Sequence, residues 1–216
     1  MPRKFSLAVF LVMLVISGRV YAQSDWKLYS NKDDIQIYTK TVSNSAFKAL
    51  KTVCTVETSL SRIAAVLLDV KNTKDWVYAT KVCSLLKQTS PSELYYYSEV
   101  TLPWPASNRD FIIRIAISQD PSTKALTVIA ENKPDYVPGK KNIVRIQQSA
   151  ANWLITPLPG GMVRVEYIMQ VDPGGLLPAW LVNMFVAKGP YQTFVKLREQ
   201  VKKPIYDNIH LGFIKD

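Results

Sequence analysis

The sequence predicts a single α+β domain in which antiparallel strands come first and a long helix comes last. Two observations lead to this fold class. Between residues 81 and 171, segments of alternating apolar and polar residues are separated only by short turn sequences such as Ser90-Pro91-Ser92 and Pro159-Gly160-Gly161. Connections this short join neighbouring antiparallel strands, because parallel strands need long crossovers. After Gly174-Gly175, the apolar residues instead recur with the period of a helix.

The first 22 residues have the pattern of a cleaved signal peptide. Arg3 and Lys4 precede an apolar core, Phe5–Ser17, that is too short to span a bilayer comfortably. Val20-Tyr21-Ala22 then offers a cleavage site, so we expect residues 23–216 to form one domain that is periplasmic or secreted. A retained membrane anchor is the alternative, and Arg19 argues against it.

Composition excludes several functional classes. Removal of residues 1–22 lowers the 27 basic residues to 24 against 17 acidic ones, a formal charge of about +7. The basic residues are scattered, which argues against nucleic-acid binding. His210 is the only histidine, which excludes His-based triads and multi-histidine zinc sites. Cys54 and Cys83 match no metal motif, and whether they form a disulfide stays open. We expect a monomer without metal or cofactor.

The segment before residue 80 is predicted to hold a hairpin and two helices. Strands are expected over Ile35–Val42 and Phe47–Glu57, joined by a turn at Ser43-Asn44-Ser45. Helical spacing then follows at Leu60, Ile63, Ala64, Leu67 and Leu68, with Thr58 or Ser59 as the N-cap. We also expect one helical turn over Asp25–Tyr29 and a second helix over Asn72–Ala79 that carries Trp76 into the core.

A run of strands follows, and the chain ends in a helix. The strands are expected over Lys81–Lys87, Glu93–Leu102, Phe111–Gln119, Ala125–Glu131, Asn142–Pro157 and Met162–Val171. With the first hairpin they make roughly eight. The alternation breaks near Ser149–Asn152, which predicts a β-bulge. Pro178 suits the first turn of the final helix, and Gly189-Pro190 predicts a kink inside it.

Alternation along the strands assigns side chains to the two faces of the sheet. Arg109 shares a face with Phe111, Ile113, Ile115 and Ile117, whereas Asp110 lies on the opposite face. A cation on an apolar face needs an anionic partner, either an internal Asp or Glu or the phosphate or carboxylate of a ligand. The inner faces of the two flanking strands would carry Tyr96, Ser98, Tyr167 and Met169. Large side chains would close this face into a core, and smaller ones would leave an apolar pocket.

Two segments resemble the START lipid-transfer domain family. Residues 102–111, Leu-Pro-Trp-Pro-Ala-Ser-Asn-Arg-Asp-Phe, are similar to the family's Pro-x-Pro-x-Ser-x-Arg-Asp-aromatic signature. Residues 172–183, Asp-Pro-Gly-Gly-Leu-Leu-Pro-Ala-Trp-Leu-Val-Asn, resemble the start of its C-terminal helix. The two occur in the family's order, and both are most similar to its phosphatidylcholine-transfer members.

The resemblance implies a helix-grip fold, in which a curved antiparallel sheet wraps around the C-terminal helix and encloses a tunnel for one lipid. Arg109 would meet the lipid phosphate, and Tyr96, Tyr167 and Trp153 would surround a quaternary ammonium group. The other predicted ligand contacts are Ser98, Met169, Ile113 and Ile115. Residues 102–108 and the start of the final helix would gate the tunnel at a membrane surface, through Trp104, Trp180, Leu181, Met184 and Phe185.

The expected function is non-catalytic binding and transfer of a phospholipid, fatty acid or other apolar ligand. Cholesterol-carrying family members have a buried acid–arginine pair, but the matching positions here are Tyr96 and Ile115. Two other classes stay open. A helix-grip enzyme acting on an apolar substrate would need an acid or base, and the inner strand faces carry no carboxylate or histidine. An interaction module with a filled core would instead use residues 176–180 as a protein contact.

Overall fold

The structure, a computed structural model, describes residues 25–43 and 47–216. Its strands are β1 (Lys27–Lys32), β2 (Ile35–Lys40), β3 (Ala49–Glu57), β4 (Thr80–Ser90), β5 (Glu93–Val100), β6 (Arg109–Gln119), β7 (Leu126–Asn132), β8 (Val144–Arg145), β9 (Gln148–Leu158) and β10 (Met162–Asp172). Its α-helices are α1 (Leu60–Leu68), α2 (Thr73–Trp76) and α3 (Ala179–Gln200), and 3₁₀ turns span Val70–Asn72 and Pro204–Tyr206. The signal peptide and most of the expected turn at Ser43-Asn44-Ser45 lie outside the described residues.

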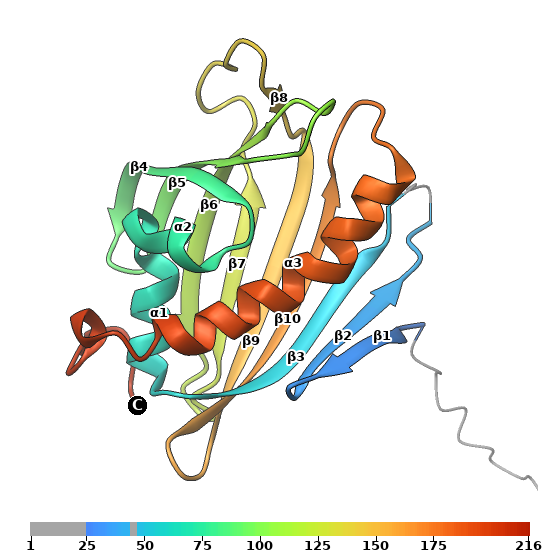
Figure 1. Cartoon of the computed structure of the whole chain (residues 1–216). Helices are drawn as coiled ribbons and strands as arrows, with labels where there is room; N and C mark the ends of the chain where they lie inside the picture. Colours follow the sequence, from blue (N-terminus) through green and yellow to red (C-terminus); the bar gives the residue numbers. More distant parts are fainter. Residues whose placement is uncertain (1–24, 44–46) are drawn as a thin grey trace, which may run out of the picture.

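One curved sheet holds all ten strands of the described chain. Its order is β1-β2-β3-β10-β9-β7-β6-β5-β4, with neighbours antiparallel, and the short β8 pairs with β6 in parallel. The helix α3 runs across the concave face, as Figure 1 shows, with α1 and α2 beside the end of the sheet that carries β4. This arrangement confirms the predicted α+β, helix-grip architecture.

Local sequence explains where the helices begin and end. Ser59 is the N-cap of α1, since its hydroxyl accepts a hydrogen bond from the Arg62 backbone N–H at 3.2 Å. The predicted apolar stripe of α1 is buried in the core. In α3, Gly189-Pro190 lies inside one continuous helix. Phe194 and Leu197 of its second half and the C-cap residue Val201 are fully buried.

Three predicted elements were wrong. Residues 27–32 form the edge strand β1 rather than a helical turn, because pairing with β2 satisfies their backbone. The second helix is short: a 3₁₀ turn leads into α2, which ends at Trp76 three residues earlier than expected. No bulge interrupts Ser149–Asn152, since β9 pairs with β10 in unbroken register. The single strand expected over Asn142–Pro157 is instead divided, because Ile146 and Gln147 separate β8 from β9.

The two cysteines are free thiols on different strands. Cys54 lies on β3 and Cys83 on β4, and five strands separate them in the sheet order. Burial raises the pKa of the Cys54 thiol to about 11. Within the described chain, no helix is both long and apolar enough to cross a membrane.

Candidate functional site

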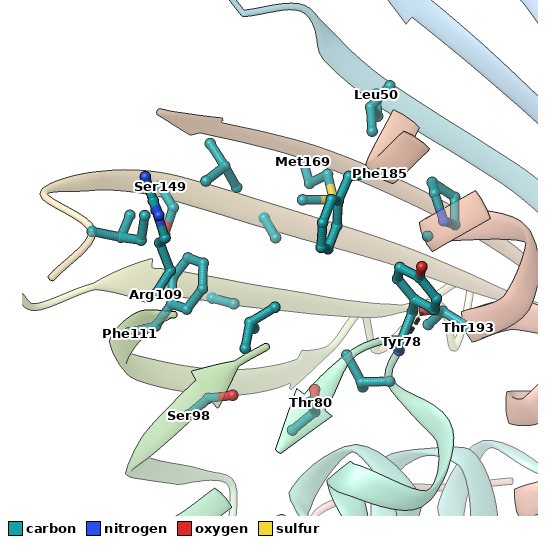
Figure 2. A pocket seen from close by; sticks show the side chains of 18 of the residues that line it. Leu50, Tyr78, Thr80, Ser98, Arg109, Phe111, Ser149, Met169, Phe185 and Thr193 are labelled. Atoms are coloured by element: carbon teal, nitrogen blue, oxygen red, sulfur yellow. Dashed lines mark hydrogen bonds between the residues drawn. The ribbon is translucent and has the colours of Figure 1, made fainter. Parts of the chain in front are cut away.

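A cavity of about 370 Å³ lies between α3 and the concave face of the sheet. Figure 2 shows side chains from several strands and from α3 converging on it. All eight residues predicted as ligand contacts line this cavity: Tyr96, Ser98, Arg109, Ile113, Ile115, Trp153, Tyr167 and Met169. Their contact with a ligand stays a prediction. Strand alternation placed seven of them on the cavity side, and Trp153 was expected there only from the family resemblance.

Small side chains in the middle of the sheet leave the space open. One row across the strands reads Ile115 on β6, Ala130 on β7, Ala151 on β9, Met169 on β10 and Leu50 on β3. All five residues line the cavity. Because the two central strands carry alanine in this row, their short side chains leave space between the sheet and α3. The filled core considered from the sequence is therefore absent from this region.

Arg109 is buried at one end of the cavity and is held by backbone carbonyls. Its side chain is only 5% exposed. Nε donates to the Pro173 carbonyl at 3.1 Å, and Nη2 donates to the Gly174 carbonyl at 3.0 Å. Nη1 donates to the carbonyl of Ser107. The guanidinium thus joins the loop that precedes β6 to the segment that leads into α3.

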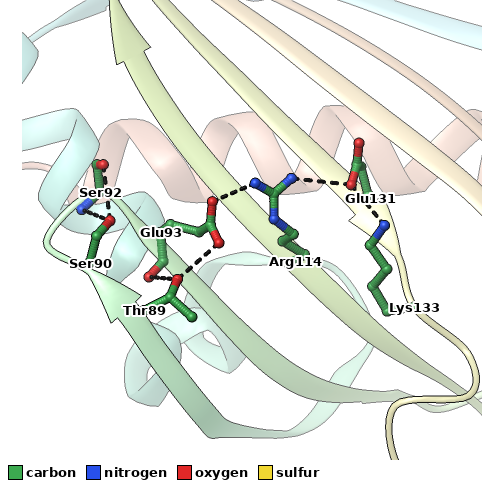
Figure 3. A network of polar contacts seen from close by, with 7 residues as sticks. All are labelled: Thr89, Ser90, Ser92, Glu93, Arg114, Glu131 and Lys133. Carbon is green, nitrogen blue, oxygen red and sulfur yellow. Dashed lines mark hydrogen bonds and ion pairs between the residues drawn. The ribbon is translucent and has the colours of Figure 1, made fainter.

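No carboxylate neutralises Arg109 within the described chain. The ion pairs found there involve other basic residues. Arg114, five residues further along β6, shows the contrast: it donates to Glu93 and Glu131 in a network on the other face of the sheet (Figure 3). These hydrogen bonds raise the pKa of Arg114, whereas burial lowers the pKa of Arg109. Of the two anionic partners considered from the sequence, the internal Asp or Glu is not found among residues 25–43 and 47–216.

The next residue, Asp110, faces away from the cavity and is fully buried. Its two carboxylate oxygens accept from Nε and Nη2 of Arg145 at 2.7 and 3.1 Å. Arg145 also donates to the carbonyls of Pro134, Val137 and Pro138. This pair fixes the start of β6 against β8 and the preceding loop, and so positions Arg109 on the opposite face.

Aromatic rings occupy the part of the cavity beyond Arg109. The Trp153 and Tyr167 rings pack with centroids 4.4 Å apart, and Phe194 lies 5.5 Å from Trp153. Tyr96 on β5 pairs with Ile113 on β6, and Ile113 is four residues from Arg109 along β6. That spacing corresponds to about 13 Å along the strand. Burial raises the pKa of both Tyr96 and Tyr167, so these hydroxyls are neutral near pH 7.

The cavity wall is apolar and contains no acid. Among the described lining residues there is no Asp, Glu or His, and the two charged ones, Lys48 and Arg109, are both basic. In the same part of the chain no cluster of His, Cys, Asp or Glu could hold a metal ion. The wall can therefore bind an apolar molecule and attract an anionic group at the arginine.

Comparison with known proteins agrees with this geometry. The START domain family model matches residues 11–204. The chain belongs to the START domain family. It is 32% identical over 190 residues to an uncharacterised protein of Pseudomonas aeruginosa, covering 87% of this chain and 92% of that one.

Two further relatives connect the chain to named START proteins. It is 28% identical over 179 residues to phosphatidylcholine transfer protein of Rattus norvegicus, covering 80% of this chain and 81% of the relative. A crystal structure of a STAR-related lipid transfer protein from Xanthomonas axonopodis superposes with a TM-score of 0.76 at 30% identity, covering 83% of this chain and 99% of that one.

The five predicted gate residues of this START domain fall into two groups. Leu181 and Phe185 line the cavity, and the Phe185 ring packs edge-on against Tyr78 at 5.5 Å. Trp104 and Trp180 are exposed to solvent and Met184 is half-buried, and none of these three is in the cavity wall. Their role as a gate stays a prediction.

Several lining residues escaped the sequence analysis. Tyr78 and Thr193 meet in the wall, where the Tyr78 backbone N–H donates to the Thr193 hydroxyl at 3.1 Å (Figure 2). Ser149, Ala151 and Ala130 line it from β9 and β7. Because the sequence predicted a bulge over residues 149–152, it did not assign Ser149 and Ala151 to a face of the sheet. Tyr78 follows a short helix with no periodic pattern, so nothing local in the sequence marks it.

Proposed function

We propose that this START domain binds one lipid whose headgroup carries a phosphate or carboxylate, and carries it between membranes without chemical change. One observation carries the proposal: an apolar cavity contains a buried arginine that no carboxylate neutralises within the described chain. A phosphate or carboxylate of the ligand would supply the missing negative charge. The names of the relatives that transfer phosphatidylcholine or lipid agree with this ligand class.

In this proposal the headgroup lies at Arg109 and the acyl chains extend toward the aromatic end. The apolar side chains of β5, β6, β10 and α3 would cover the chains, and the hydrophobic effect would supply most of the affinity. Tyr96 pairs with Ile113, which lies about 13 Å from Arg109 along β6, and this separation exceeds the size of one small headgroup. Tyr96 is thus better placed to contact acyl chains than to surround an ammonium group beside the same phosphate.

Exposed apolar residues at the Arg109 end of the cavity support a membrane contact. Trp104, in the loop before β6, is 90% exposed, and Leu176, before α3, is fully exposed. Trp180 in the first turn of α3 is half-exposed. Tryptophan and leucine side chains on a surface partition into the interface of a bilayer. We propose that these residues bring the cavity mouth to the donor and acceptor membranes.

Catalysis is the less favoured alternative. General acid–base chemistry requires a positioned group that titrates near the working pH. The described cavity wall offers only serine, threonine, neutral tyrosines and basic groups. We therefore propose binding without turnover, by a monomer exported through the N-terminal signal sequence.

A transfer assay with recovery of the ligand tests this function. The mature chain would be mixed with donor vesicles that contain a labelled phospholipid and with unlabelled acceptor vesicles. We expect transfer to rise with protein concentration and the label to be recovered chemically unchanged. A converted lipid would favour the enzyme alternative, and the absence of transfer and of bound lipid would favour the interaction module.

A further inference from the structure

The acceptors of Arg109 belong to two segments at one end of the cavity, which in the proposed function form its mouth. Ser107 lies in the loop 102–108, whereas Pro173 and Gly174 lie between β10 and α3. A guanidinium group has five N–H donors, and these contacts use three of them. Within the described chain two donors remain, and because Arg109 lines the cavity we infer that a ligand anion would use them while both segments stay in place.

The arrangement leaves a positive charge inside the protein. Carbonyl dipoles satisfy hydrogen bonds but carry no net charge, and Arg109 has no carboxylate partner in the described chain. Arginine stays protonated at neutral pH, and a buried charge without a counterion is unfavourable. Without a bound anion, this unneutralised charge therefore destabilises the arrangement in which the two segments enclose the guanidinium.

The segment before α3 has a backbone shaped for this contact. Gly174 and Gly175 have φ of +64° and +65°, in the left-handed region that favours glycine. A Cβ added to Gly175 would lie 3.7 Å from Nη2 of Arg109. Two consecutive left-handed glycines thus turn the chain closely over the arginine and present the carbonyls of residues 173 and 174 to it.

We propose that Arg109 makes closure of the mouth depend on an anionic group in the ligand, so that the domain retains phosphate- or carboxylate-bearing lipids over neutral lipids with the same chains. This inference rests on the proposed function. A bound anion neutralises the guanidinium while its carbonyl contacts persist, and this stabilises the closed arrangement. A neutral lipid fills the cavity but leaves the charge unpaired. A ligand shifts such an equilibrium only by its difference in affinity for the two states.

Hydrogen exchange of the mature chain, read by mass spectrometry, tests the proposal. The chain would be loaded from vesicles that contain either phosphatidic acid or diacylglycerol with identical acyl chains, two lipids that differ only in the phosphate. We expect phosphatidic acid to slow exchange in residues 102–108 and 173–178 by about tenfold, and diacylglycerol to leave it near the value of the empty protein. Inorganic phosphate forms a third arm, and protection by phosphate alone would assign the effect to any anion rather than to a lipid headgroup.

The outcomes separate this inference from the function on which it rests. Retention of both lipids with equal protection would overturn the coupling and leave lipid binding intact. Retention of neither lipid would refute the proposed function and the inference together. Both results come from the wild-type chain, so they do not depend on how well a variant folds.

Variants give a second readout. Arg109→Gln removes the charge but keeps a hydrogen-bond donor, and we expect it to show the same exchange with both lipids. Arg164→Gln is the matched control, because Arg164 pairs with Glu166 on the exposed side of β10 and does not line the cavity. The control should keep the wild-type difference between phosphatidic acid and diacylglycerol. A difference that survives in Arg109→Gln would contradict the role given to the arginine.

Discussion

Three arginines in and beside β6 differ in how their charge is compensated. Arg145 is buried with Asp110, and Arg114 lies on the outer face between Glu93 and Glu131. Arg109 is buried with carbonyl acceptors alone. The first two arginines are structural, since their partners are part of the fold. Arg109 has no such partner within the described chain, which is why we propose that it meets a charge on the ligand.

The buried pair of Asp110 and Arg145 should matter for stability far more than the surface pairs. In Asp110→Asn, Arg145 would keep its charge in a buried site without a counterion. We expect the free energy of unfolding to fall by about 3–5 kcal/mol, measured by urea denaturation. Glu57→Gln, which breaks an exposed pair with Lys202, should cost about 1 kcal/mol or less. Similar small losses in both variants would contradict this account.

Glu99 makes stability depend on acid pH. It accepts hydrogen bonds from Lys81 at 3.0 Å and from Asn108, in the loop 102–108, at 2.7 Å. Burial alone would raise the pKa of Glu99, but these hydrogen bonds outweigh burial and lower it. The stabilisation is therefore complete above the unfolded pKa of about 4.3 and is lost as the pH falls through the folded pKa.

The measurement compares the wild type with Glu99→Gln by urea denaturation at pH 7 and pH 3. We expect the wild type to be more stable at pH 7 and this advantage to shrink at pH 3, because the protonated carboxyl resembles the amide. Other carboxyl groups titrate in both proteins and cancel in the difference. A gap of the same size at the two pH values would show that Glu99 contributes nothing through its charge.

At the residue scale, the sequence predicted the wall of the cavity better than its electrostatics. Alternation along β5, β6 and β10 depends only on residue order, so it placed Tyr96, Ile113 and Met169 correctly on the cavity side. The partners of Arg109 are backbone carbonyls, which have no residue-type signature. The sequence therefore left an internal carboxylate and a ligand as equal alternatives, and only the folded arrangement separates them.

At the scale of secondary-structure elements, the alanines of β7 and β9 are what make the domain hollow. Ala130 and Ala151 are neighbours across the two strands and lie beneath α3. Strands with a large apolar residue at both positions would have the same alternation and the same register. A domain with a cavity and a domain with a filled core thus differ in the side-chain volume of this one row, whereas their topology is the same.

Filling that row should abolish lipid uptake and spare the fold. In Ala151→Phe the ring would enter the space that acyl chains need. We expect bound lipid to fall at least tenfold and the free energy of unfolding to change by about 1 kcal/mol or less, since the ring enters an empty space. Leu154→Phe is the control, because Leu154 lies on the exposed side of the same strand. Unchanged lipid uptake in Ala151→Phe would place the ligand elsewhere.

Elements with one buried face were predicted well, and those without one were missed. The strands β2, β3 and β10 alternate between more buried and more exposed residues over most of their length, so their pattern appears in the sequence. The edge strand β1 has exposed residues throughout most of its length and therefore no alternation. Its structure comes from pairing with β2, which is a tertiary contact that local sequence does not encode.

At the scale of the whole molecule, the domain is polarised along α3. This helix is about 33 Å long, with its first turn beside Leu176 and Trp180 and its last turn before Ile205. Figure 1 shows its start on the side of the loops before β6 and before α3, and its end near the C-terminus. The exposed apolar residues proposed for membrane contact thus gather at one end of the molecule.

Membrane contact should depend on that end alone. In Trp104→Ala an exposed indole is removed, so we expect the free energy of unfolding to be unchanged and transfer between vesicles to fall several-fold. Ile205→Ala is the matched control, because Ile205 is 59% exposed beyond the far end of α3. Sedimentation with vesicles and the transfer assay would both report the effect. Equal losses in the two variants would refute a directed contact.

Native mass spectrometry of the exported protein tests the central claim most directly. The chain would be produced with its signal sequence, purified from the extracytoplasmic fraction and measured before and after organic extraction. We expect a mature chain that begins at Gln23 and carries one extractable lipid with a phosphate or carboxylate. We also expect much less of that lipid on Arg109→Gln than on Arg164→Gln. A protein that carries no lipid and takes up none from mixed vesicles would contradict this claim.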